Sequence, residues 1–252
     1  MSRIIVGVPG PWRERTELMQ ALARQGTDYM FAGLVFVEQS TRTSCEFDFA
    51  GHDPELRGAV EIAGQGKFSA AELDEVARHA STAWLIFDDP GHDTARTAAR
   101  FARALLEAGG MAVKVDSAGL AHTRERWLRG WNSDDPWDIY SLFVVLVGDE
   151  GRFFSCGMHN FALPDAAVPD SLGAEEGARL LNLFNLYRLV ESPVLNSGET
   201  FSLEADSPRF RLTHEPYVDG YEGTPMHNPH GLWSLQPVEA APEKRRWRWR
   251  WP

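Results

Sequence analysis

Four side chains capable of acid–base, nucleophilic or metal chemistry are gathered in residues 153–165: Cys156, His159, Asn160 and Asp165. A thiol beside an imidazole can form a nucleophile, and an imidazole oriented by a carboxylate can act as a general base or a metal ligand. The apolar run that contains Cys156 predicts a buried strand that gives way to a turn at His159. These residue types do not define a reaction by themselves, and no complete catalytic signature occurs elsewhere in the chain.

The two interpretations of Cys156 differ in what surrounds the thiol. Strand alternation over 153–159 places Phe154, Cys156 and Met158 on one face and His159 on the other. A cysteine nucleophile needs an imidazole or a positive field beside it, and this alternation supplies neither. We therefore favour a buried structural thiol over a catalytic one, since free cysteine is among the most buried residue types.

The turn that follows has a structural and a catalytic interpretation. Asn160 and Asp165 are residue types that bond to nearby backbone and shape turns, and this is the favoured role. In the alternative, His159 is a general base or a metal ligand oriented by Asp165, with His122 or His227 completing the site of a small-molecule hydrolase or metal-dependent enzyme.

Other polar residues are candidates for a pocket. Lys114 lies midway along a predicted buried strand, where a lysine is costly unless it is paired, and Cys156, Asn160 and His227 are the remaining pocket candidates. The local spacings typical of zinc sites are absent from the chain. We therefore predict no metal and no cofactor.

The elements that must position these residues alternate between strand and helix patterns. In the first half we expect strands at 3–8, 30–37, 43–49 and 82–87 and helices at 12–25 and 69–79, the latter with Ser69 and Glu72 as a capping box. An alanine-rich helix at 94–108, capped by Asp93, is expected to connect the halves. In the second half we expect strands at 111–115, 139–147, 152–158 and 209–214, helices at 118–131 and 174–190, and a short strand at 232–235.

This order predicts an α+β fold of two successive βαββαβ (ferredoxin-like) halves joined by a helix, with one mixed α/β sheet as the alternative. The expected domains are an N-terminal half at 1–92, a connecting helix at 93–110, a C-terminal half at 111–238 and a basic tail at 239–252.

Charge and hydrophobic patterning restrict the function classes. The net charge is −11, although the last nine residues carry five positive charges, so the first 243 residues carry 36 acidic and 20 basic side chains. Such an acidic body is expected to repel nucleic acid and to attract basic partners. The chain has no apolar run long enough to span a membrane and does not begin with a secretory signal, so we expect a cytoplasmic protein.

The tail 239–252 alternates arginine with tryptophan from Arg246 to Trp251. Its partner is left open: such a strip can bind a membrane surface, stack on nucleic acid or fold back on the acidic body.

Aromatic and acidic residues of the second half predict a surface for a basic partner. A few buried aromatic side chains usually supply most of the affinity of an interface, and complementary charge speeds the encounter. The expected binding residues are Trp131, Trp137, Tyr217 and Tyr221, with Asp134, Asp135 and Asp138 around them.

Several segments resemble the bacterial domain of unknown function 4261, whose members include type VI immunity-type proteins. The matching segments are 109–115, 117–122 with Trp127, 155–159, 163–165, 183–187, 198–201 and 228–233. The resemblance implies a bacterial α/β protein of the cytoplasm that binds and neutralises a protein toxin, and it implies no catalytic residues. The basic tail departs from the family pattern.

Overall fold

The computed structural model describes residues 2–149, 151–204, 206–216, 222–224 and 227–238. The basic tail and the predicted binding residues Tyr217 and Tyr221 lie outside these ranges. Within them the predicted α+β class is confirmed, because helices cover two separate β-sheets.

The first sheet is antiparallel throughout and uses the N-terminal half of the chain. Its strands are β1 (Ile4–Gly10), β2 (Tyr29–Ala32), β3 (Val35–Glu38), β4 (Thr43–Gly51), β5 (Ser81–Phe87), β6 (Ala112–Val115) and β7 (Leu120–Thr123). They lie in the order β2-β3-β4-β5-β1-β6-β7. The central strand β1 therefore pairs with strands that follow it by about 70 and about 100 residues, so long-range contacts define this sheet.

Helices cover both faces of the first sheet. They are α1 (Arg15–Arg24), α2 (Leu56–Ala63), α3 (Ala70–Ala77), α4 (His92–Glu107), α5 (Arg124–Gly130) and α6 (Pro136–Phe143). The alanines of α4 are small enough to let this helix pack closely on β1 and β5, and they form the largest core with Trp127 and Phe143. On the opposite face, α2 and α3 pack against Ala112 and Ala121.

The second sheet has one parallel pair. Its strands are β8 (Val145–Asp149), β9 (Arg152–Cys156), β10 (Asp165–Pro169), β11 (Thr200–Phe201), β12 (Phe210–Glu215) and β13 (Leu232–Pro237). They lie in the order β11-β12-β13-β10-β9-β8, and β10 is parallel to β13. Helix α7 (Ala174–Glu191) packs across β9 and β10 through Leu180, Leu181 and Phe184.

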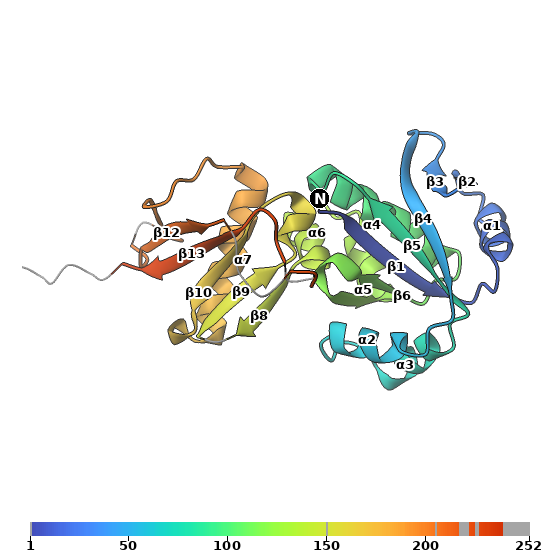
Figure 1. Cartoon of the computed structure of the whole chain (residues 1–252), viewed down its shortest axis with the longest axis horizontal. Coiled ribbons are helices and arrows are strands. Elements are labelled where there is room, and N and C mark those ends of the chain that lie inside the picture. Colours follow the sequence, from blue (N-terminus) through green and yellow to red (C-terminus); the bar gives the residue numbers. More distant parts are fainter. Residues whose placement is uncertain (1, 150, 205, 217–221, 225–226, 239–252) are drawn as a thin grey trace, which may run out of the picture.

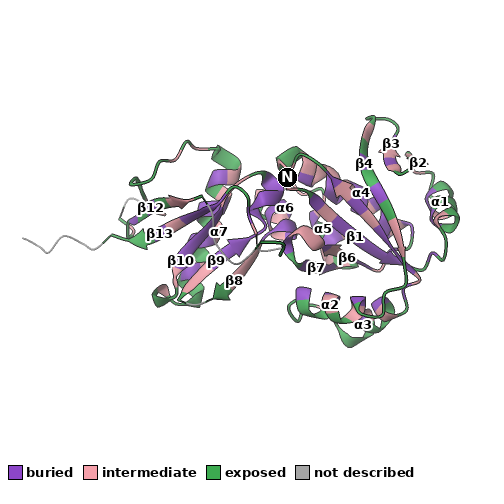
Figure 2. Cartoon of the chain, viewed as in Figure 1, coloured by how far each residue is buried: buried purple, intermediate pink, exposed green. Residues whose placement is uncertain are grey.

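The two sheets lie side by side along the long axis of the molecule, with α6 between them (Figure 1). Buried positions concentrate in α4 and in the central strands, whereas α1 and α3 are largely exposed (Figure 2). Because β6 and β7 belong to the first sheet, the chain passes from one sheet to the other between Thr123 and Val145. The helix expected to connect the halves instead packs on the first sheet as α4.

The order of elements departs from the predicted repeat in the first half. The run expected as one strand at 30–37 is the hairpin β2-β3, because Gly33 takes φ +63 and turns the chain. Helix α2 was not predicted, although the Asp53 side chain just before it accepts a hydrogen bond from the Glu55 amide (2.9 Å). The expected cap of α4 was wrong: the helix begins at His92 after Gly91, with Asp93 inside its first turn. The capping box of Ser69 and Glu72 is present.

The largest differences lie between residues 118 and 147. The expected helix at 118–131 begins instead as β7, because Gly119 takes φ +64 and returns the chain to pair with β6, and Thr123 then caps α5. The expected strand at 139–147 is first helix α6, because the Asp135 side chain accepts a hydrogen bond from the Trp137 amide and Pro136 takes the first helical position. Strand β10 begins at Asp165, the last residue of the segment expected as a turn, and its other residues lie outside the predicted elements.

Candidate functional site

The chain turns sharply at the end of β9 because of Gly157. This residue has φ +116, and a Cβ atom at this position would lie 2.0 Å from the carbonyl oxygen of Phe143. The following 3₁₀ turn, Met158–Phe161, carries His159 and Asn160 away from the line of the strand. The alternation predicted over 153–159 therefore ends at Cys156, and the turn decides where His159 points.

Asn160 is fully buried and connects the turn to its surroundings. Its amide nitrogen donates to the carbonyl oxygens of Gly157 (2.9 Å) and Phe143 (3.3 Å). Its amide oxygen accepts from the Ser117 hydroxyl (2.8 Å). These hydrogen bonds all go to other groups of the chain. Asn160 therefore holds the end of α6 and the turn after β6 against the turn after β9.

Asp165 is buried at the first residue of β10, and three donors converge on its carboxylate. Oδ1 accepts from the Ser155 hydroxyl (3.1 Å) and the Met158 amide (3.2 Å), and Oδ2 accepts from the Asn228 side-chain amide (2.7 Å). Burial raises the pKa of Asp165 to about 6, although these hydrogen bonds and the charge of Arg188 oppose the shift. The carboxylate thus fastens β9, the turn and the segment before β13 to one point.

A buried cation lies behind this carboxylate and was not predicted from the sequence. The Arg188 guanidinium donates to the Pro164 carbonyl oxygen (2.8 Å) and to the side-chain oxygen of Asn185. Asn185 in turn donates to the Tyr140 hydroxyl (3.2 Å). The spacing of Asn185 and Arg188 on one face of a helix, three residues apart, was the signal available in the sequence.

His159 lines a cavity of about 450 Å³, which we call the His159 cavity, together with Arg3, Asp116, Ser117 and His227. The side chain is 5% exposed, and its Nδ1 atom has no hydrogen-bond partner among the described residues. Burial lowers the pKa of His159 to about 4, the Ser117 backbone opposes the shift, and His230 and His227 add to it. His159 is therefore a neutral imidazole at pH 7, able to accept or donate one further hydrogen bond.

The structure separates the other residues of the predicted catalytic group. His122 is buried against Trp127, and its Nε2 lies 2.9 Å from the Leu142 carbonyl oxygen. Asp165 has its three donors elsewhere, and no hydrogen bond links it to His159 in the described part of the chain. Only His227, of the two histidines expected to complete the site, lines the same cavity as His159.

Two of the predicted pocket residues meet in a second cavity. Lys114 and Cys156 both line a cavity of about 400 Å³, which we call the Lys114 cavity. Lys114 forms an ion pair with Asp116, and its Nζ lies 5.9 Å from the centre of the Trp84 ring. Burial raises the pKa of the Cys156 thiol well above its ordinary value, which keeps it protonated and makes it a poor nucleophile at neutral pH.

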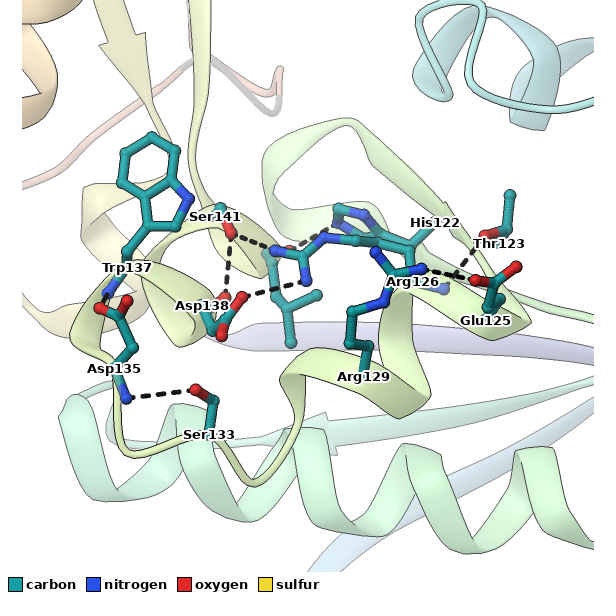
Figure 3. A network of polar contacts seen from close by, with 11 residues as sticks. His122, Thr123, Glu125, Arg126, Arg129, Ser133, Asp135, Trp137, Asp138 and Ser141 are labelled. Atoms are coloured by element: carbon teal, nitrogen blue, oxygen red, sulfur yellow. Dashed lines mark hydrogen bonds and ion pairs between the residues drawn. The ribbon is translucent and has the colours of Figure 1, made fainter.

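The predicted acidic and aromatic surface lies at the start of α6 (Figure 3). Trp137 is 42% exposed, and Asp134 and Asp135 beside it are exposed. Asp138 is half-buried because it pairs with Arg126 (3.2 Å), and the Trp131 ring packs under the Arg103 guanidinium. Trp137, Asp134 and Asp135 therefore form the part of this surface that a partner can reach.

The low pKa of His159 predicts a pH dependence of stability. The pKa of His159 is 6.5 in the unfolded chain and about 4 in the folded one. The contribution of neutral His159 to the free energy of unfolding is therefore fully present above pH 6.5 and is lost as the pH falls through about 4. We expect His159→Gln to lose less stability than the wild type when the pH is lowered from about 7 to about 4.5. Urea unfolding at both pH values tests this, and parallel losses in the two proteins would contradict it.

Among the described residues, no group of three or more His, Cys, Asp or Glu side chains is placed to hold a metal ion. No helix in the described ranges is long and apolar enough to cross a membrane.

No protein-family model, curated protein or solved structure matches the chain.

Proposed function

We propose that this chain is a binding protein that neutralises a basic protein toxin, and that the start of α6 is its recognition surface. The observation that carries the proposal is the exposure of Trp137: this residue is 42% exposed in the first turn of α6, while Ile139 and Tyr140 of the same helix are buried. A tryptophan held on a rigid helix loses little conformational freedom on binding and is typical of residues that dominate interface affinity.

The charges around Trp137 favour a basic partner. Asp134 and Asp135 are exposed, and neither forms an ion pair with another described residue. The first 243 residues carry 36 acidic against 20 basic side chains, so the long-range field attracts cations. The proposal follows the resemblance to immunity-type proteins and gives it a definite surface.

The local structure behind Trp137 supports a preformed site. Asp135 accepts from the Trp137 amide (2.9 Å), and the Ser133 hydroxyl accepts from the Asp135 amide (3.2 Å). Arg126 joins α5 to α6 through Asp138 and Ser141 (Figure 3). The turn is therefore fixed before a partner arrives, which reduces the entropy cost of association.

We expect Trp137→Ala to weaken binding of the partner by about 2 kcal/mol or more, roughly 30-fold. The chain serves as bait in a lysate of its source cells, the captured protein is purified, and its dissociation constant is measured for the wild type and the variant. The captured protein should be basic, and its association should slow as salt is added.

A pair of charge reversals provides the matched comparison. Asp134→Lys should slow association, whereas Asp74→Lys, the same change of charge at an exposed position of α3, should leave the association rate within a small factor of the wild type. Asp135 is kept in both variants because its side chain caps α6. Equal affinity in all four proteins would rule out this surface. An acidic captured protein would rule out the proposed class of partner.

A second candidate function is hydrolysis of a small molecule. It is favoured by Nδ1 of His159, which has no hydrogen-bond partner in the described part of the chain and belongs to a residue lining a cavity that His227 and Asp116 also line. A neutral imidazole in that position could act as a general base. If this function holds, His159→Gln should abolish turnover of hydrolase substrates while Trp137→Ala leaves it unchanged. Hydrolysis that survives in the His159 variant would exclude this site.

A further inference from the structure

The Lys114 cavity is lined by residues of both sheets. Its walls come from α2, from β6 and the turn after it, and from β8 and β9 of the second sheet. The lining residues are Ala59, Ile62, Ala63, Gln65, Lys114, Ala118, Gly119, Val145, Val147 and Cys156. Its volume of about 400 Å³ falls in the range of small-molecule sites, which often lie between structural units.

The walls of this cavity are apolar and incompletely covered. Ile62 is 82% exposed, although Val60 and Ala63 on the same helix are packed against the first sheet. Val145 and Val147 alternate along β8, an edge strand, and remain only half-buried. An exposed isoleucine beside two half-buried valines is apolar surface that an aliphatic chain would remove from water.

Lys114 is the one charged residue among those that line the cavity. It lies on the face of β6 that α2 covers, two residues from the buried Ala112. Its side chain is 15% exposed, whereas its partner Asp116 is 44% exposed at the side chain and lines the His159 cavity instead. Lys114 therefore lines an apolar hollow, and its counter-charge Asp116 is not among the residues that line it.

Apolar walls with a single cation match an amphipathic anion. A carboxylate can replace or share the interaction of Lys114 with Asp116, while the alkyl chain covers Ile62, Val145 and Val147. An alkyl amine would place a second cation beside Lys114, and an alcohol would gain the apolar contacts alone. The thiol of Cys156 takes no part in a reaction here and acts only as wall.

We propose that the Lys114 cavity binds a medium-length aliphatic carboxylate, with the chain between α2 and β8 and the carboxylate at Lys114. This site is separate from the recognition surface at α6. The proposal of a carboxylate ligand therefore does not depend on the proposed protein partner.

Calorimetric titration of the full chain with octanoate, octanol and octylamine tests the proposal. Octanoate should bind the wild type at least tenfold more tightly than octanol, and octylamine should bind more weakly than either. Lys114→Met should reduce octanoate affinity at least tenfold and leave octanol unchanged, and Lys114→Arg should restore octanoate binding. Asp116→Asn, which removes the competing carboxylate, should tighten it.

A filling variant locates the ligand. Ala59→Phe introduces a ring at the cavity wall on the half-buried side of α2 and should abolish binding of octanoate and octanol alike. Undiminished binding in this variant, or equal octanoate affinity in the wild type and Lys114→Met, would overturn the proposal, as would no octanoate binding at all. If Lys114→Met fails to fold, the ranking of the three ligands on the wild type and the response of Ala59→Phe decide it.

Discussion

Replacing Asp165 with alanine is expected to lower the free energy of unfolding at pH 7 by about 3 kcal/mol, because three buried donors lose their acceptor at once. The donors are the Ser155 hydroxyl of β9, the Met158 amide of the turn after it and the Asn228 side chain of the segment before β13. The buried Arg188 guanidinium would also lose the larger of the two charge interactions that favour its protonated form, which comes from Asp165.

The pH dependence of the free energy of unfolding distinguishes loss of the Asp165 carboxylate from simple loss of packing. The pKa of Asp165 is 3.8 in the unfolded chain and about 6 in the folded one, so its contribution to stability is complete below pH 3.8 and decreases as the pH rises through about 6. His159 and His122, with folded pKa values of about 4, contribute in the opposite sense over the same window. The stability of Asp165→Ala should therefore rise more steeply than that of the wild type between about pH 4 and about pH 6.

Urea unfolding of the wild type, Asp165→Ala and Asn228→Ala measures these effects. The double variant should lose less than the two single losses combined, since both remove the same bond. Asp74→Ala on the surface of α3 is the control and should change stability by less than about 0.5 kcal/mol. A comparably small loss in Asp165→Ala, with a pH profile parallel to that of the wild type, would show that the three bonds do not anchor the sheet.

The parts of the fold that could be predicted are those decided by neighbouring residues. The capping box of Ser69 and Glu72 and the amphipathic run of α4 are local signals, and both are present as helices. Leu120–Thr123, by contrast, are a strand because they pair with β6, and Ile139–Phe143 are a helix because Asp135 caps it. Apolar runs of this length fit either state, so the pairing or the cap decides between them.

The candidate site shows the same division. Burial of Cys156 was predicted from alternation, and the structural role of Asn160 and Asp165 from their residue types. The position of His159 could not be predicted. It depends on the φ of Gly157 and on a cavity whose walls include residues as distant in the chain as Arg3 and His227. The Lys114 cavity likewise requires the two sheets to meet.

Gly157→Ala is expected to be the most destabilising of the substitutions considered, at about 4 kcal/mol. The methyl group would be 2.0 Å from the Phe143 carbonyl oxygen and 3.1 Å from Cβ of Ala118, and the backbone would also have to keep φ +116. The clash involves backbone at the end of a buried helix, so it cannot be relieved by a rotamer change. Moving the turn away from Phe143 would break the bonds through which Asn160 holds it.

Gly33→Ala isolates the conformational part of this effect. Gly33 has φ +63, and among the described residues no heavy atom beyond its chain neighbours lies within 4 Å of the place that an alanine methyl group would take. Alanine there should therefore cost about 1 kcal/mol from backbone strain alone. Urea unfolding and amide hydrogen exchange of both variants measure the difference. If Gly157→Ala costs no more than Gly33→Ala, the contact with Phe143 is not tight. The opposite result is that Gly157→Ala is far costlier than Gly33→Ala, with amide exchange rising in β6 and α6 as well as in β9. That result would show that the turn after β9 joins the two sheets into one cooperative unit, because Ser117, Phe143 and Gly157 all bond to Asn160.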